Sequence, residues 1–405
     1  MADAVWGSLP FDEAIDYFRN KVNFPADDYK SISGGMHARA FTVAGATNDA
    51  LLSDFRSAID KAISEGTSLG EFKKDFDQIV AKHGWSYNGS RGFRTDVIFN
   101  TNVNMAYAAG RWQQIERTAK MFPYLIYVTR NNSRVRPAHR AWHGIILPVD
   151  HPWWKTHFPP NGYRCYCHVR QLTRRQAEEM KASGKYITEA PADEWVEHVS
   201  SKTGEVTMIR KGIDFGFDYN PGIAAWGTKF SELADSAAPD KYIPLTTNTF
   251  KDYHRPDLVP LSETDIKPIP ALKSASDAVQ WLTDNIGADK VFSVQQGDFK
   301  HSLLLDAEYF GKHLEKDLNR SRFFPFIQDI LSDPFEVWAS FEKSVNNEKV
   351  VLRYRYIKAY KLEKNKAVLV VFDALKGVVT GHTYFQTNDM KYLNKQRYGT
   401  LLYGK

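Results

Sequence analysis

The densest group of residues able to do chemistry lies between positions 130 and 168. Both cysteines of the chain, Cys165 and Cys167, fall there, together with five of its twelve histidines. In a strand, residues i and i+2 point the same way, so the two thiols are expected to share a face. Two thiolates and one or two imidazoles can hold a tetrahedral zinc ion. We take His139 as the first partner of the thiols and His143 as the next. The alternative is two small thiols buried in a crowded core.

The same stretch is strongly basic. Residues 130–175 hold nine Lys or Arg and a single acid, Asp150. Residues 291–405 hold 18 basic against 13 acidic side chains, which accounts for the whole net charge of +5. Both segments are candidates for meeting a polyanion or an acidic partner. The alternative is a solvated surface whose counter-charges are supplied by the fold.

Polar residues of catalytic type are spread through the chain after position 290. They are His301, His313, Arg353, Lys358, His382, Thr383, Tyr384, Arg397 and Tyr403. Metal-independent RNA cleavage needs a general base near the 2′-OH, an acid near the leaving oxygen and cations that hold the scissile phosphate. A histidine with a basic residue and a hydroxyl donor on one sheet face would suffice. The sequence shows no acidic cluster typical of two bound divalent ions, so metal-dependent cleavage is less favoured.

Helices are expected to dominate the region before these groups. Apolar residues recur at three-to-four spacing within 11–22 and within 51–63, which places them on one face of each helix. Ser68 and Glu71 form the S-x-x-E spacing of a capping box at the start of a third helix. A long fourth helix is expected over about 94–120.

The pattern predicts a multidomain α+β fold in four parts. These are a helical N-terminal region (1–120), a compact loop-rich module core (121–211), a proline-rich linker (212–275) and an α+β domain with an antiparallel sheet (276–405). The order of helices followed by hairpin-connected strands in the last part is typical of the α+β class.

Shorter elements are predicted inside the last three parts. The module core is expected to hold strands at 124–128 and 145–147 and short polar helices at 173–183 and 190–200. The last part is expected to hold helices at 274–287, 303–320, 324–332 and 388–396, and strands at 335–342, 350–362, 367–373, 378–385 and 400–403.

Length and composition limit the class of protein. The chain has 405 residues, of which 43% are hydrophobic and 14% aromatic, so it is not a mainly disordered chain or a disulfide-knotted miniprotein. Its apolar runs fall short of the roughly 20 residues that span a bilayer. Its first residues do not read as a signal peptide. We therefore expect folding in a reducing cytosol and no membrane partner.

Several motifs follow one another in a characteristic order over roughly residues 5–222. They are LPFDEAIDYFRNKV, FTVAGATNDALLSDFRSAIDKAI, FKKDFDQIVAKHGW, IFNTNVNMAYAAGRW and RVRPAHRAWHGIILPVDHPWW, followed by PPNGYRCYC. In this order they resemble the Mu F-like minor head proteins of the phage head morphogenesis family. Members often carry Asp where this chain has Ser133, and Cys-Arg-Cys where it has Cys165-Tyr166-Cys167.

This resemblance implies a low-copy structural protein of a tailed-phage head. It implies action in head assembly near the portal, with the portal and other capsid or scaffold proteins as partners and phage DNA as a further candidate. The expected location is the host bacterial cytoplasm during assembly and then the virion head.

A second resemblance covers about residues 290–405. The motifs KHSLLLDAEYFGKHL, LSDPFEVW, RYIKAY, VVTGHTYFQT and RYGTLLY resemble the phage-encoded members of the barnase–EndoU–colicin–RelE-like nuclease superfamily. The resemblance implies cleavage of RNA, as a toxin or host-directed effector carried by the particle. The residues it implies are His301 or His313 for proton transfer, Lys358 and Arg397 for phosphate charge, and Thr383 and Tyr384 as hydrogen-bond donors.

Three functions stay open at this level. The first is a head-assembly protein with an active, metal-independent ribonuclease domain that requires no cofactor, with structural zinc as a candidate ligand of the chain. The second is a purely structural virion protein whose C-terminal domain is an inactive nuclease fold used for binding. The third is a bacterial polymorphic toxin with a phage-derived delivery module, for which an immunity protein is the expected partner.

Overall fold

The chain divides into two compact units, Met1–Ala225 and Trp226–Lys405. The computed structural model describes residues 11–27, 29, 34–199, 204, 206–226, 242–246, 248–296, 299–312, 317–345, 350–362, 366–375, 378–387 and 389–405. The units combine helices with several sheets, which confirms the predicted multidomain α+β class. No helix among the described residues combines the length and the apolar character needed to cross a bilayer.

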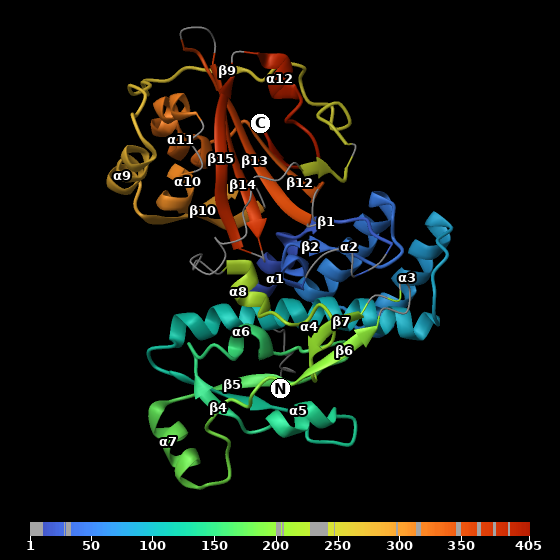
Figure 1. The fold of residues 1–405 in the computed structure, drawn as a ribbon. Coiled ribbons are helices and arrows are strands. Elements are labelled where there is room, and N and C mark those ends of the chain that lie inside the picture. The colour runs from blue at the N-terminus through green and yellow to red at the C-terminus, as the bar shows by residue number, and fades with distance from the viewer. Residues whose placement is uncertain are drawn as a thin grey trace, which may run out of the picture. The chain divides into compact units, whose positions relative to one another are not determined.

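Four helices form the first part of unit 1 (Figure 1). They are α1 (Asp12–Arg19), α2 (Asp49–Glu65), α3 (Leu69–His83) and α4 (Arg91–Thr118). The predicted capping box is confirmed, since the Ser68 hydroxyl accepts from the Glu71 N–H while the Glu71 carboxylate accepts from the Ser68 N–H. Gly110 of α4 lies against α1, where an added Cβ would come within 2.8 Å of the Ala14 nitrogen. The two helices therefore need glycine at this position to pack this closely.

Short elements join these helices. They are β1 (Val22–Asn23), which pairs in parallel with β2 (Ala40–Phe41), and the 3-10 helix η2 (Gly34–Ala38).

The rest of unit 1 surrounds a three-stranded antiparallel sheet of order β4-β3-β5. Its strands are β3 (Tyr124–Val128), β4 (Ile146–Pro148) and β5 (His168–Leu172), and its helices are α5 (Pro137–Trp142), α6 (Trp154–His157), α7 (Arg174–Ala182) and α8 (Pro221–Trp226). The sheet packs Ile126, Ile146 and Leu172 against Ala177 of α7. The predicted strands and the helix over 173–183 are confirmed.

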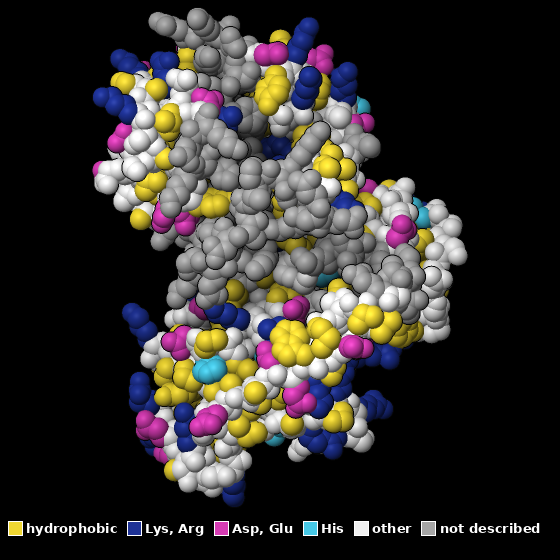
Figure 2. Space-filling view, in the orientation of Figure 1, with side chains coloured by type: hydrophobic (Ala, Val, Ile, Leu, Met, Phe, Trp, Pro, Cys, Tyr) yellow, Lys and Arg dark blue, Asp and Glu magenta, His cyan; other side chains and the backbone are white. Residues whose placement is uncertain are grey.

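The helix predicted over 190–200 is wrong. This segment forms β6 (Trp195–Val199), which pairs with β7 (Val206–Arg210) in an antiparallel hairpin. β-Branched and aromatic residues favour a strand over a helix in such a short segment. Trp195, Val199 and Val206 are exposed on this hairpin, and Figure 2 shows hydrophobic side chains over β6 and β7.

Unit 2 is built on one large sheet. Its main strand order is β10-β11-β15-β14-β13-β12-β16, with β8 paired to β12 and β9 paired to β13. The strands are β8 (Tyr242–Pro244), β9 (Leu261–Ser262), β10 (Asp289–Gln296), β11 (Phe299–Asp306), β12 (Glu336–Ser344), β13 (Val350–Tyr360), β14 (Lys366–Leu375), β15 (Val378–Thr387) and β16 (Thr400–Gly404). The helices are α9 (Ala275–Asn285), α10 (Ala307–Lys312), η4 (Leu318–Phe326), α11 (Ile327–Ser332) and α12 (Met390–Asn394).

The side chains of β13 pack against different groups on its two faces. On one face, the Tyr360 ring packs edge-on to Phe326 and its hydroxyl donates to Asp329 of α11; Figure 1 shows α9, α10 and α11 along this side of the sheet. On the other face, Ile357 joins a buried cluster with Trp338. Because side chains alternate along a strand, Arg353 and Arg355 share this second face with Ile357.

Two sequence predictions for this half need correction. The segment 212–275, predicted as a linker, supplies β8 and β9 to the sheet, and Phe250 and Val259 are buried in the core of unit 2. The helix predicted over 303–320 is instead the end of β11 followed by α10 and part of η4. The predicted strands over 335–385 and the last strand are confirmed.

Candidate functional sites

Unit 1 brings the three predicted metal ligands together. His139 Nδ1 lies 3.6 Å from Cys165 Sγ and 3.5 Å from Cys167 Sγ. All three potential ligand atoms lie within 4.8 Å of one another. His139 comes from α5, whereas the cysteines lie just before β5.

The imidazole is oriented by a carbonyl group far along the chain. His139 Nε2 lies 2.7 Å from the Gly212 carbonyl oxygen, and a carbonyl only accepts, so Nε2 carries the proton and Nδ1 faces the sulfurs. Gly212 has φ +91°, and an added Cβ would come within 2.6 Å of Ala138 and 2.8 Å of Trp142. Only glycine therefore allows this close approach. Sequence reasoning missed Gly212, because its role depends on a contact with a distant segment.

Hydrogen bonds also surround the sulfurs. A hydrogen bond from Cys167 holds the pKa of Cys165 well below its usual range, with a further contribution from His139, although burial opposes the shift. That same bond and burial raise the pKa of Cys167. The Asn161 backbone N–H donates to Cys165, and the Tyr127 hydroxyl donates to Asn161 Oδ1 at 2.9 Å. The surroundings of the two sulfurs therefore favour ionisation of Cys165 before Cys167.

His143, the second predicted partner of the thiols, has another contact. Its Nδ1 accepts a hydrogen bond of 3.1 Å from the Thr129 backbone N–H. Among the described residues, the group of potential ligands consists of His139, Cys165 and Cys167 alone. Of the two histidines predicted as partners, the structure therefore brings His139, and not His143, to the thiols.

A cleft of about 640 Å³ opens beside the three residues. Its lining includes His139, both cysteines, the acid Asp96 and five basic residues, namely Lys73, Arg130, Arg134, Arg136 and Arg164. Two of the cations are paired, Arg136 with Asp214 at 3.0 Å and Arg164 with Asp96. Cys165 and Cys167 also line a second cleft of about 550 Å³ with a more apolar wall. The sulfurs therefore lie where two clefts meet.

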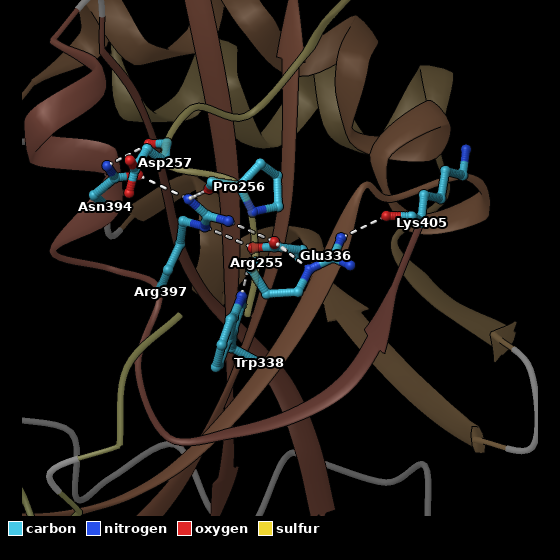
Figure 3. Close-up of polar contacts among 8 residues, drawn as sticks. All are labelled: Arg255, Pro256, Asp257, Glu336, Trp338, Asn394, Arg397 and Lys405. Carbon is cyan, nitrogen blue, oxygen red and sulfur yellow. Dashed lines mark hydrogen bonds and ion pairs between the residues drawn. The ribbon is translucent and has the colours of Figure 1, made fainter. Parts of the chain in front are cut away.

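In unit 2, Arg397 belongs to a buried ion-pair network. Its guanidinium makes two bonds to the Glu336 carboxylate, of 2.7 and 2.6 Å, and Arg255 adds a third of 2.9 Å. The Nη1 atom of Arg397 donates to the Pro256 carbonyl oxygen and to Asn394 Oδ1 (Figure 3). The Arg397 side chain has 0% exposure. The structure therefore does not support the predicted phosphate contact by Arg397, because its donors already serve the fold.

Lys358 is also held by protein partners. Its Nζ lies 2.9 Å from Asp329 and 2.9 Å from Asp333, and its side chain is 8% exposed. Burial acts to lower the pKa of Lys358, but the two carboxylates outweigh it and raise the pKa. The predicted phosphate contact by Lys358 is therefore not supported either, since its charge is already balanced.

A further group of polar side chains surrounds Glu342, on the face of the sheet opposite to Lys358. Arg353 Nη1 lies 2.9 Å from Glu342 Oε2, and Arg355 forms an ion pair with the other carboxylate oxygen. Ser340 and Tyr398 each donate to Glu342, at 2.9 and 2.8 Å. Glu342 is 2% exposed, whereas Arg353 is 16% exposed. Of the residues in this group only Arg353 was predicted from the sequence, because the contacts of the others depend on the register of β12 against β13.

The sheet register separates two of the predicted catalytic residues. β11 and β15 run parallel, with Leu304 opposite Thr380. His301 lies three residues before Leu304 and Thr383 three after Thr380, so they are six steps or about 20 Å apart along the strands. Thr383 pairs with Val371, which pairs with Arg355. The register therefore brings Thr383 level with Arg355, whereas Glu342, opposite Val351, lies about level with Val378 and His301. His301 is nevertheless separated from Glu342 across the sheet, because three strands lie between β11 and β12.

Two predicted residues remain. Tyr384 pairs with Val370 on β14, one position along from Thr383. His313 lies outside the described residues. Both stay predictions.

Two families match separate parts of the chain. Residues 53–170 match the family described as Phage Mu protein F like protein. Residues 53–170 form a Mu F-like domain. Residues 280–404 match the family described as phage-Barnase-EndoU-ColicinE5/D-RelE like nuclease2 and form a nuclease2 domain. Both resemblances predicted from the sequence are confirmed.

The chain is also similar to curated phage and prophage proteins. Protein F of Escherichia phage Mu, named for capsid assembly, is 32% identical over 273 residues, which are 60% of this chain and 62% of that protein. The Mu-like prophage FluMu F protein of Haemophilus influenzae is 35% identical over 221 residues, 49% of this chain and 53% of that protein. The chain thus spans less than two thirds of either relative. No solved structure shows a significant match.

The sites fall within these domains. The Mu F-like domain contains His139, Cys165 and Cys167, and Gly212 lies beyond its matched residues. The nuclease2 domain contains the Glu342 group, whereas Arg255 of the Glu336 network lies before it.

Proposed function

We propose that this chain acts in the assembly of a tailed-phage head. The supporting observations are its similarity to a phage Mu protein named for capsid assembly, over 60% of the chain, and its Mu F-like domain. Its partners are then the portal and other capsid or scaffold proteins. Its location is the host cytoplasm and then the virion head.

This part of the proposal is tested in phage particles. The gene for the full chain is deleted in the phage or prophage that carries it, and particles are counted by electron microscopy. We expect few complete heads, with recovery when the full chain is supplied from a plasmid. Normal heads without the chain, or its absence from purified particles, would overturn the proposal.

For the nuclease2 domain we infer RNA cleavage without a metal ion. The observation that carries this is the Glu342 carboxylate with Arg353 and Arg355 on one sheet face, inside residues that match a nuclease family. A carboxylate can act as a general base and guanidinium groups can hold a phosphate. Arg353, 16% exposed, is the cation of this set that a phosphate can reach, whereas Arg355, 3% exposed, is held by protein partners as Lys358 and Arg397 are and orients Glu342.

The reaction that fits this set is attack by the 2′-oxygen of RNA. Glu342 takes the 2′-hydroxyl proton, the oxygen bonds to phosphorus and the bond to the 5′-oxygen breaks, which leaves a 2′,3′-cyclic phosphate. Arg353 stabilises the negative charge that develops on the phosphate oxygens, and Arg355 holds the Glu342 carboxylate in place. The departing 5′-oxygen takes a proton from an acid, for which His313 is the predicted donor. His301 does not fit this centre, because the strands β15, β14 and β13 lie between β11, which carries His301, and β12, which carries Glu342.

The test uses the purified full chain and a labelled RNA in the presence of EDTA. We expect cleavage to products that end in a 2′,3′-cyclic phosphate. The near-complete burial of Glu342 favours a second candidate function, an inactive nuclease fold that only binds. That function predicts RNA retention that weakens with salt and no new products, and this outcome would overturn the enzymatic proposal.

A further inference from the structure

We propose that His139, Cys165 and Cys167 bind one thiophilic divalent metal ion of the zinc class. The distances from Nδ1 to the sulfurs are 3.5 and 3.6 Å. A tetrahedral zinc ion with ordinary bond lengths to sulfur and nitrogen holds such atoms about 3.6 Å apart. The three side chains are thus spaced as the ligands of such an ion.

Hydrogen bonding alone does not explain this arrangement. A neutral imidazole with a proton on Nε2 has a single lone pair on Nδ1, which accepts one S–H hydrogen bond. Two sulfurs nevertheless lie at nearly equal distances from that atom. An ion at the centre of the three groups gives each of them a bond and accounts for both distances.

The neighbours of the three side chains are those that metal ligands commonly have. A ligating histidine usually donates its other ring N–H to a carbonyl or carboxylate, which fixes its orientation. His139 makes this contact with Gly212 at 2.7 Å. Cys165 receives a backbone N–H from Asn161, which stabilises thiolate charge on its sulfur. Asn161 is held in turn by the Tyr127 hydroxyl, which donates to its Oδ1 at 2.9 Å.

The site leaves one coordination position open. Three protein ligands and one free position are typical of zinc sites that accept water or an outside ligand. Among the described residues, the group has no fourth histidine, cysteine or carboxylate. Both cysteines line the two clefts, so a ligand can reach the ion from solvent.

The first test is metal analysis of the full chain purified without chelators from zinc-supplemented cells. We expect about one zinc per chain, and near none in a Cys165→Ser, Cys167→Ser double variant. The matched control is His168→Gln, which alters an exposed histidine next to Cys167 and should keep its zinc. A wild-type chain without zinc that also takes up none on titration would overturn the proposal.

The second test needs no variant, so it holds even if the double variant does not fold. Cobalt(II) is titrated into the zinc-free full chain. We expect a thiolate-to-cobalt charge-transfer band and intense visible bands typical of tetrahedral cobalt, which zinc then abolishes. Weak bands without charge transfer would contradict thiolate ligation. Thiocyanate should shift the visible bands if the fourth position is open, and unchanged bands would overturn that part of the proposal.

Discussion

His139 and Gly212 are joined by a hydrogen bond of 2.7 Å across 73 positions of sequence. This contact fixes which imidazole nitrogen faces Cys165 and Cys167. It places the segment after β7 directly against α5, so the orientation of His139 depends on a residue beyond the matched part of the Mu F-like domain. The domain and the segment that follows it therefore act as one structural unit at this site.

Replacing Gly212 by alanine should be more destabilising than replacing Gly184. Both glycines have positive φ, but only Gly212 has neighbours within 3 Å of an added Cβ, whereas Gly184 faces open space. We expect Gly184→Ala to cost about 1 kcal/mol of unfolding free energy and Gly212→Ala about 3 kcal/mol or more. Urea denaturation of the full chain measures both. Equal costs would show that the close approach to Ala138 and Trp142 is not tight.

Arg397→Ala should strongly destabilise unit 2. The substitution leaves the Glu336 carboxylate buried with fewer partners, and breaking a buried pair costs about 3–5 kcal/mol. The matched control is Lys361→Ala, which breaks an exposed pair with Glu263 and should leave the urea midpoint unchanged. If Arg397→Ala behaves like the control, the Figure 3 network does not hold this end of the sheet.

The contribution of Glu336 should depend on pH. Burial acts to raise its pKa, but hydrogen bonds from Arg397, Trp338 and Arg255 hold it below its ordinary value of 4.5. The stabilisation is therefore complete above pH 4.5 and is lost as pH falls through the lower pKa of the folded state. We expect the difference in urea midpoint between wild type and Glu336→Gln to shrink as the pH falls below about 4. A pH-independent difference would mean that the charge of Glu336 does not stabilise the fold.

Local signals explain what could be predicted from the sequence. The capping box of α3 and the apolar face of α2 depend on residues within a few positions of each other, so they were predicted correctly. The proximity of His139 to Cys165 and Cys167 was also expected, from the density of histidines and cysteines in residues 130–168.

Contacts between distant segments explain what could not be predicted. The Glu342 group forms only when β12, β13 and Tyr398 come together, and the sequence of either strand alone does not predict these contacts. The prolines after 212 suggested a linker, yet Pro244 pairs opposite Glu342 on the short strand β8, where a missing N–H is tolerated at a sheet edge. The leucines at 303–305 fit a helix or a buried strand equally well by periodicity.

The most direct test of the nuclease proposal compares RNA cleavage in EDTA by wild type, Glu342→Gln and Glu263→Gln. Glu263 is an exposed carboxylate in an ion pair with Lys361, so its variant controls for loss of charge alone. Arg353→Gln, at the more exposed cation of the group, is a second variant if Glu342→Gln unfolds. We expect Glu263→Gln to match wild type and Glu342→Gln to cleave at least about 100-fold more slowly. Cleavage by folded Glu342→Gln or Arg353→Gln at the wild-type rate would contradict the account.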